Sequence, residues 1–183
     1  MHIGYRLPYM ASTLCVCFIT SAPVASADEP QSSRTLQVSG TGMDLLNGAL
    51  VHSKESTPTG EVQRSTEIVV LEGDLKGRVL YHVTTVIDTK KGTLVNTGNQ
   101  VFSGTVLGSE PVMLLDSKFR FDVNLKTGAE SGLVFLDDHI AGPPVQCDLK
   151  VTGTGKTADG NPKFSYTGTC TFRGRHRKRD SHA

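Results

Sequence analysis

Three side chains are the clearest candidates for chemistry in this chain of 183 residues. His82 lies in the middle of a segment rich in Val, Ile, Tyr and Thr, directly after Tyr81, and Tyr166 lies in a similar segment nearer the C-terminus. A histidine that lines an apolar cavity can donate a proton or orient a ligand, and a tyrosine can offer its hydroxyl. The same residues are also common packing residues in β-strands. We treat His82, Tyr81 and Tyr166 as candidate ligand-binding residues and assign no catalytic residue.

Metal ligands and nucleophiles are less evident. The run Asp137-Asp138-His139 resembles part of a metal site, but adjacent residues rarely converge on one ion, and the sequence contains no complementary cluster. We interpret this run as a polar corner before Gly142-Pro143-Pro144. No Gly-x-Ser-x-Gly motif marks a nucleophile, and the glycine-rich run 153–156 lacks the following helix that phosphate binding needs. The sequence predicts neither a bound metal nor a cofactor.

Cys147 and Cys170 form the best-determined local pattern. When they are placed opposite each other in a hairpin, Val151 falls opposite Tyr166, and the apolar side chains of both strands share the cysteine face. In an exported protein, two cysteines so placed are expected to form a disulfide, with two buried thiols as the alternative. Oxidation would leave the predicted mature chain without a thiol for nucleophilic catalysis.

The first 27 residues have the features of a cleaved signal peptide. Arg6 provides a positive start, residues 14–19 are apolar, and residues 25–27 form a small-residue cleavage site. The apolar run is shorter than the ~20 residues that span a bilayer. The alternative is a poorly ordered N-terminus that stays in the cytosol. We predict cleavage after Ala27, a secreted or periplasmic location, and a disordered segment over 28–33.

The charge distribution limits the choice of partners. The predicted mature chain of 156 residues carries 18 basic and 18 acidic residues, and the tail 173–183 holds five of the basic ones. The body 28–172 is therefore acidic, with 13 basic against 17 acidic residues. An acidic body argues against a nucleic acid as partner. We predict a disordered basic tail, with a weak contact to anionic surfaces as the alternative.

Residues 66–88 are typical of a β-hairpin, because two runs of β-forming residues flank a glycine-containing turn. Pairing Glu72 with Arg78 closes the turn over 73–77 and sets Ile68 opposite His82. Both faces of this hairpin are mostly apolar. We therefore expect one face to line a barrel interior and the other to be covered by another subunit or another segment, so a homo-oligomer is predicted.

The rest of the chain is also predicted to form strands. Further strands are predicted at 35–41, within 94–107 (centred on 101–106), at 112–115, 118–125 and 131–136, and in a hairpin over 147–170 with its loop at 154–163. In 118–125 the large apolar residues alternate with charged and polar ones, which is typical of a half-buried strand. Residues 43–51 fit either a bulged strand or a short helical turn, 54–60 are predicted as loop, and 137–144 cannot form a central strand. The prediction is an all-β fold, a single antiparallel β-barrel of about eight strands over 34–172, with a β-sandwich as the alternative.

Two glycine-containing motifs resemble those of bacterial allene-oxide-cyclase-like barrel domains. The run Gly73-Asp74-Leu75-Lys76-Gly77 matches their turn between two β-runs, and the segment 102–108 (FSGTVLG) matches a following F-x-G-T-(V/L)-x-G motif. The run 151–155 (VTGTG) resembles a glycine-rich strand end in such domains. The resemblance implies an eight-stranded antiparallel barrel, often oligomeric, whose cavity takes a small apolar molecule. No functional residue of the family is carried over to this chain.

Two functions of different classes follow. The first is a secreted barrel that binds a small apolar ligand or serves as a structural or interaction module. The second is an isomerase or cyclase that acts on an apolar, oxylipin-like substrate inside the barrel. An apolar cavity with two or three converging polar groups favours the second, and a packed interior favours the first.

Overall fold

The computed structural model describes residues 33–174. The predicted signal peptide 1–27 lies outside the described residues. So do all but the last residue of the segment 28–33 and all but the first two residues of the basic tail 173–183.

The described chain consists of ten β-strands and one turn of 3-10 helix. Their bounds are β1 Arg34–Asp44, η1 Leu46–Gly48, β2 Leu50–Thr57, β3 Gly60–Gly73, β4 Leu75–Asp88, β5 Thr93–Val106, β6 Val112–Asn124, β7 Glu130–Leu136, β8 Asp138–Ala141, β9 Val145–Lys156 and β10 Pro162–Phe172. Within residues 33–174 no helix is long and apolar enough to cross a membrane.

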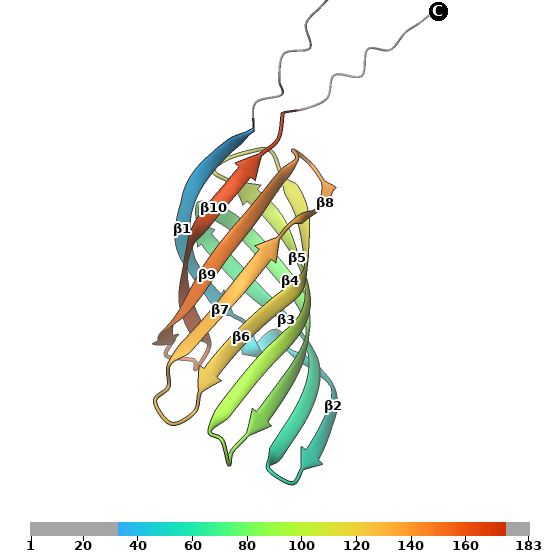
Figure 1. Ribbon diagram of the computed structural model, residues 1–183, viewed down its shortest axis with the longest axis vertical. Helices are drawn as coiled ribbons and strands as arrows, with labels where there is room; N and C mark the ends of the chain where they lie inside the picture. The colour runs from blue at the N-terminus through green and yellow to red at the C-terminus, as the bar shows by residue number, and fades with distance from the viewer. Residues whose placement is uncertain (1–32, 175–183) are drawn as a thin grey trace, which may run out of the picture. The chain divides into compact units, whose positions relative to one another are not determined.

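Eight of these strands close into an antiparallel barrel (Figure 1). Around the ring the order is β1, β10, β9, β7, β6, β5, β4 and β3, and β3 pairs with β1 to complete the circle. The predicted all-β barrel of about eight strands is confirmed. Closure between β1 and β3 excludes the β-sandwich alternative, because a sandwich keeps two separate sheets.

β2 and β8 lie outside the closed ring. β1 and β2 follow one another along β3, separated by η1, so the helical-turn alternative for 43–51 is the observed one. The predicted loop over 54–60 is wrong for its first half, because β2 continues to Thr57. Ion pairs hold it against β3, with Lys54 Nζ 2.8 Å from Glu61 and Arg64 2.9 Å from Glu55. β8 is a four-residue strand paired with β6, in keeping with the expectation that 137–144 forms no central strand.

The β3–β4 hairpin forms with a register two residues away from the predicted one. Ile68 pairs with Leu80 and Thr66 with His82, so the predicted pairs Glu72–Arg78 and Ile68–His82 are wrong. A shift of two residues leaves every side chain on its predicted face. The turn is fixed by other strands and not by cross-strand charge: Ser39 N–H in β1 donates to Asp74 Oδ2 at 2.7 Å, and Leu75 N–H donates to the Tyr166 hydroxyl of β10 at 2.8 Å.

The β9–β10 hairpin has the predicted register. Cys147 pairs with Cys170, Leu149 with Gly168, and Val151 with Tyr166. A disulfide joins the two cysteines, whose Cα atoms lie 4.1 Å apart. The predicted face is also observed, because Cys147, Cys170 and Tyr166 are all buried in the barrel.

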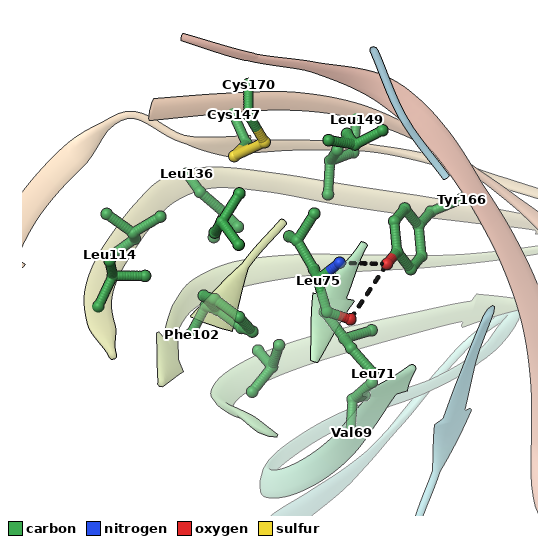
Figure 2. Close-up of a cluster of buried hydrophobic side chains, with 14 of the residues drawn as sticks. Val69, Leu71, Leu75, Phe102, Leu114, Leu136, Cys147, Leu149, Tyr166 and Cys170 are labelled. Atoms are coloured by element: carbon green, nitrogen blue, oxygen red, sulfur yellow. Dashed lines mark hydrogen bonds between the residues drawn. A yellow bond between two sulfur atoms is a disulfide. The ribbon is translucent and has the colours of Figure 1, made fainter. Parts of the chain in front are cut away.

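One end of the barrel interior is filled with apolar side chains, and we call it the packed end. Its core consists of the fully buried Leu75, Phe102, Leu114 and Leu136 together with the disulfide (Figure 2). These residues come from the start of β4, the end of β5, the start of β6 and the end of β7, which meet at the same level of the ring. The opposite end of the interior is different and contains the candidate site.

Candidate ligand-binding cavity

A cavity of about 380 Å³ occupies the end of the barrel opposite the packed end. Most of its wall is aliphatic or aromatic. The apolar lining residues are Leu46, Val69, Leu71, Val79, Leu94, Phe119, Phe121, Val123, Leu125, Val134, Leu149, Val151, Pro162 and Phe164, with Leu136 at the boundary to the packed end. The face predicted for 118–125, with its Phe, Val and Leu side chains, forms one side of this cavity.

A row of polar side chains crosses four neighbouring strands where the packed end gives way to the cavity. In register, Glu67 of β3 lies opposite Tyr81 of β4, Tyr81 opposite Gln100 of β5, and Gln100 opposite Asp116 of β6. All four are buried. We call Glu67, Tyr81, Gln100 and Asp116 the polar row. Because directly opposite residues point to the same face of a sheet, the row forms a continuous polar band inside the barrel.

The Asp116 half of the polar row is structural. Its carboxylate, fully buried, accepts hydrogen bonds from Gln100 Nε2 at 2.9 Å, from the backbone N–H of Phe135 at 2.9 Å and from that of Lys118 at 2.6 Å. These bonds tie β6 to β5 and β7 beside a register shift in the β5–β6 ladder. The carboxylate therefore satisfies backbone donors that the irregular ladder leaves unpaired.

The Tyr81 half of the polar row is an acidic cluster that opens onto the cavity. The Tyr81 hydroxyl lies 2.7 Å from Glu67 Oε2 and 2.9 Å from Asp44 Oδ2. Ser65 Oγ donates to Glu67 Oε1 at 2.5 Å. Asp44 is the last residue of β1, where the chain turns into η1, so its side chain reaches the strand pair β3–β4 from the next strand of the ring. We call Asp44, Glu67 and Tyr81 the acidic cluster.

The electrostatics of the acidic cluster follow from burial. Burial, reinforced by the nearby Glu67 carboxylate, raises the pKa of Asp44 to about 7. Burial and the two carboxylates raise the pKa of Tyr81 well above its ordinary value, so its hydroxyl stays protonated. Asp44 is therefore a carboxyl group that exchanges its proton near neutral pH beside a permanent phenol donor.

Two oxygens of the cavity wall have no hydrogen-bond partner. Asp44 Oδ1 and Asn96 Oδ1 are both shielded from solvent, and within residues 33–174 neither accepts a hydrogen bond. Both residues line the cavity. A buried acceptor without a donor is unfavourable, so a donor supplied by a bound molecule would stabilise this arrangement.

The three candidate residues from the sequence lie in three different environments. Tyr81 lines the cavity and belongs to the acidic cluster. His82, as the next residue on the strand, points to the outer face and is exposed. There its Nδ1 lies 2.7 Å from Thr66 Oγ1, which is also 2.7 Å from Nε2 of His52. The interpretation of His82 as a cavity residue is thus corrected: alternation along β4 that places Tyr81 inside must place His82 outside.

Tyr166 lies at the inner boundary of the cavity, but its hydroxyl is already engaged. It accepts the N–H of Leu75 at 2.8 Å and donates to the Leu75 carbonyl at 3.1 Å (Figure 2). It also lies 3.2 Å from the Glu72 carbonyl oxygen. Burial raises the pKa of Tyr166. A Cβ at Gly40 would lie 2.3 Å from this hydroxyl, so glycine is required there. Tyr166 therefore fastens β10 to the β3–β4 turn and has little capacity left for a ligand.

Within the run 137–139, Asp137 and His139 bond to different partners. Asp137 accepts a hydrogen bond from Lys118 Nζ at 2.6 Å, and His139 Nε2 lies 2.9 Å from the Gly142 carbonyl oxygen. In the part of the chain that the structure describes, no three His, Cys, Asp or Glu side chains gather in a way that would hold a metal ion.

Sequence reasoning missed Asp44, Glu67, Asn96 and Gln100 as cavity residues. Glu67 carried a usable signal, because it is a charged residue directly before Val69 and Leu71 on the inward face of the strand. Asp44 carried none, since it lies where strand and turn were equally compatible with the sequence.

Comparison with known proteins adds no relative: no family model, no curated protein and no solved structure matches the chain. The resemblance to allene-oxide-cyclase-like domains therefore stays a prediction. Its matched glycines have local roles, since Gly73 and Gly108 have positive φ angles of 107° and 72° at the ends of strands.

Proposed function

We propose that this protein is an exported β-barrel that holds a small, mostly apolar ligand in its cavity. The observation that carries the proposal is the cavity of about 380 Å³, whose wall is apolar except for a few convergent polar side chains. This combination is typical of small-molecule sites, where the apolar wall provides affinity and the polar groups fix orientation. The packed end closes the barrel behind it.

The Cys147–Cys170 disulfide supports the exported location, because such bonds persist in oxidising compartments. A secreted or periplasmic location also fits the predicted signal peptide 1–27. N-terminal sequencing of protein recovered outside the cytosol tests this part. A first residue at Asp28 supports export with cleavage after Ala27, and a retained Met1 contradicts it.

Ligand binding is tested with N-phenyl-1-naphthylamine, a neutral probe whose fluorescence rises in apolar sites. The variant Val134→Trp fills cavity space, and Leu133→Trp, its outward-facing neighbour on β7 at 46% exposure, is the matched control. We expect saturable probe binding to wild type and to the control, and a loss of about tenfold or more in Val134→Trp. Absence of saturable binding to the wild type, or equal binding to both variants, contradicts the proposal.

A second candidate function is an isomerase or cyclase that acts on an apolar substrate in the same cavity. It is favoured by the acidic cluster, which supplies the converging polar groups expected for an enzyme of this kind and includes a carboxyl group with a pKa of about 7. General acid–base catalysis works best with such a group. Incubation with an unsaturated fatty-acid epoxide tests it. An excess of one product enantiomer that is lost in Tyr81→Phe supports the activity, and a racemic product contradicts it.

A homo-oligomer is also part of the proposal. Leu80 and Val86, on the outer face of β4, are 50% and 42% exposed in the single chain. No segment within residues 33–174 covers them, so a second copy is the proposed cover. Light scattering of the purified protein tests it, since a monomer at micromolar concentration contradicts the proposal.

The basic tail is proposed to contact anionic surfaces weakly.

A further inference from the structure

The number of protons in the acidic cluster is fixed by its geometry. The Tyr81 hydroxyl has one hydrogen but lies within hydrogen-bond distance of two carboxylates, Glu67 and Asp44. It can donate to one of them only. The other carboxyl group is stabilised when it carries a proton of its own, because burial and the neighbouring carboxylate disfavour a second negative charge. Without a ligand the cluster therefore holds one proton beyond that of Tyr81.

The shorter contact and the Ser65 bond distinguish the two carboxyl groups. Glu67 accepts from Tyr81 at 2.7 Å and from Ser65 at 2.5 Å, so both of its oxygens are satisfied as acceptors. Asp44 has the longer contact and a second oxygen, Oδ1, without a partner. The extra proton is therefore held by Asp44, and the group open to a ligand is the Asp44 carboxyl.

The unpartnered atoms in the cavity wall are acceptors. Asp44 Oδ1 and Asn96 Oδ1 each need a hydrogen-bond donor, and a ligand polar group that only accepts hydrogen bonds would leave both unpaired. A hydroxyl donates one hydrogen, whereas an ammonium donates three.

The charges that line the cavity also favour a cationic ligand. Among residues 33–174, the carboxyl groups that line it are those of Asp44, Glu67 and Glu130, and the one lysine is Lys156, an exposed residue at the end of β9. A carboxylate ligand would lie beside like charges, and a cation would lie beside opposite ones. The rings of Tyr81, Phe119, Phe121 and Phe164 also line the cavity. Aromatic faces attract cations and repel anions.

We propose that the ligand of this cavity carries a protonated amine on a small apolar body, with Asp44 as the residue that binds the ammonium group. This inference rests on the proposed ligand-binding function and specifies its chemistry. The ammonium donates to Asp44 Oδ1, and the apolar body fills the space between the phenylalanine rings. Binding displaces the proton of Asp44, which passes to the solvent, so the ammonium meets an ionised carboxylate.

Three matched probes test the inference at pH 8 by isothermal titration calorimetry on the mature protein: octylamine, octanol and octanoate. They share one alkyl chain length and differ in head group. We expect octylamine to bind about tenfold or more tightly than octanol, and octanoate to bind weakest. The variants are Asp44→Asn and, as control, Asp148→Asn, which changes an exposed carboxylate on the outer face of β9.

Each outcome is decisive. Amine selectivity that is lost in Asp44→Asn and kept in Asp148→Asn supports the inference. Octanol or octanoate binding as tightly as the amine overturns it and leaves the proposed function standing. Selectivity that survives in Asp44→Asn also overturns the assignment to Asp44. No saturable binding of any probe overturns the proposed function itself.

Proton release on binding distinguishes an Asp44 that binds the ligand from an Asp44 with a structural role only, because only the first loses its proton to the solvent. At pH 7 the heat of octylamine binding is measured in two buffers of different ionisation enthalpy. The other titratable groups that line the cavity with Asp44 are Glu67 on β3, Tyr81 on β4, Glu130 on β7, Lys156 on β9 and Tyr166 on β10. We expect proton release in the wild type and none in Asp44→Asn. Equal release in both proteins would assign the proton to another group and overturn the proposed step.

Discussion

The two ends of this barrel are built from the same strands but have opposite interiors. Along β5 the inward residues change from Phe102 at the packed end to Gln100 and Asn96 at the cavity, and along β4 they change from Leu75 to Tyr81 in the same way. The change occurs at the same level in neighbouring strands, which produces the polar row. The barrel fold is thus stabilised mainly at one end, and the other end is free to hold polar groups that folding does not need.

The two ends should differ most in the free energy of unfolding that is lost when one phenylalanine at each end is truncated. Phe102→Ala removes a ring that is fully buried at the packed end and should lower the free energy of unfolding by about 4 kcal/mol. Phe119→Ala removes a partly buried ring that already borders empty space, so about 1–2 kcal/mol is expected. Urea denaturation of both variants measures this. Equal losses would mean that the two ends contribute equally to stability.

Removing the disulfide should have the second-largest effect on the free energy of unfolding. Cys147 and Cys170 are 23 residues apart, and loss of a cross-link of this span costs about 3 kcal/mol by relaxing the unfolded chain. The double variant Cys147→Ala/Cys170→Ala should therefore unfold at lower urea concentration, while octylamine binding in the folded protein stays unchanged, because the bond lies at the packed end. Reduced probe affinity in the folded variant would contradict the independence of the two ends.

The acidic cluster should make stability depend on pH. The Asp44 carboxyl has an ordinary pKa of 3.8, which the fold raises to about 7, so between these values the folded protein holds a proton that the unfolded chain releases. The stability contributed by this proton is fully present below the unfolded pKa and is lost as the pH rises through 7. Asp44→Asn should then be more stable than wild type at pH 8, by roughly 2 kcal/mol after allowing for solvent screening, and this difference should shrink toward pH 5.

Thermal unfolding of wild type, Asp44→Asn and Asp148→Asn across this pH range provides the measurement. The control at the exposed position 148 should follow the wild type at every pH. A wild-type stability that rises between pH 5 and pH 8 relative to Asp44→Asn would reverse the sign and contradict the protonated cluster.

The smallest effect is expected at His82, the candidate that the structure places on the outer wall. His82→Gln should change the free energy of unfolding by no more than about 0.5 kcal/mol, because the side chain is exposed and glutamine can still reach Thr66. Probe affinity should not change. A clear loss of probe binding in this variant would mean that the cavity is not the binding site.

The sequence predicted the fold far better than the site, and particular residues show why. Alternation in 118–125 and the cysteine register of 147–170 are repeating local patterns, and each was confirmed because burial enforces them. The β3–β4 register was missed by two residues, because its turn is held by Ser39 and Tyr166 from distant strands. The acidic cluster depends on Asp44 reaching across the closure of the ring, and barrel closure brings together residues whose spacing in sequence contains no sign of their contact.

Methyl NMR of the mature protein during an octylamine titration tests the central claim most directly. The claim is that a ligand occupies one end of the barrel and not the other. Val123, Val134 and Val151 line the cavity, and Val106 and Val112 are buried at the packed end. We predict saturable shifts of the first three and unchanged signals for the last two. Shifts spread equally over both groups, or no saturable shift at all, would contradict the account.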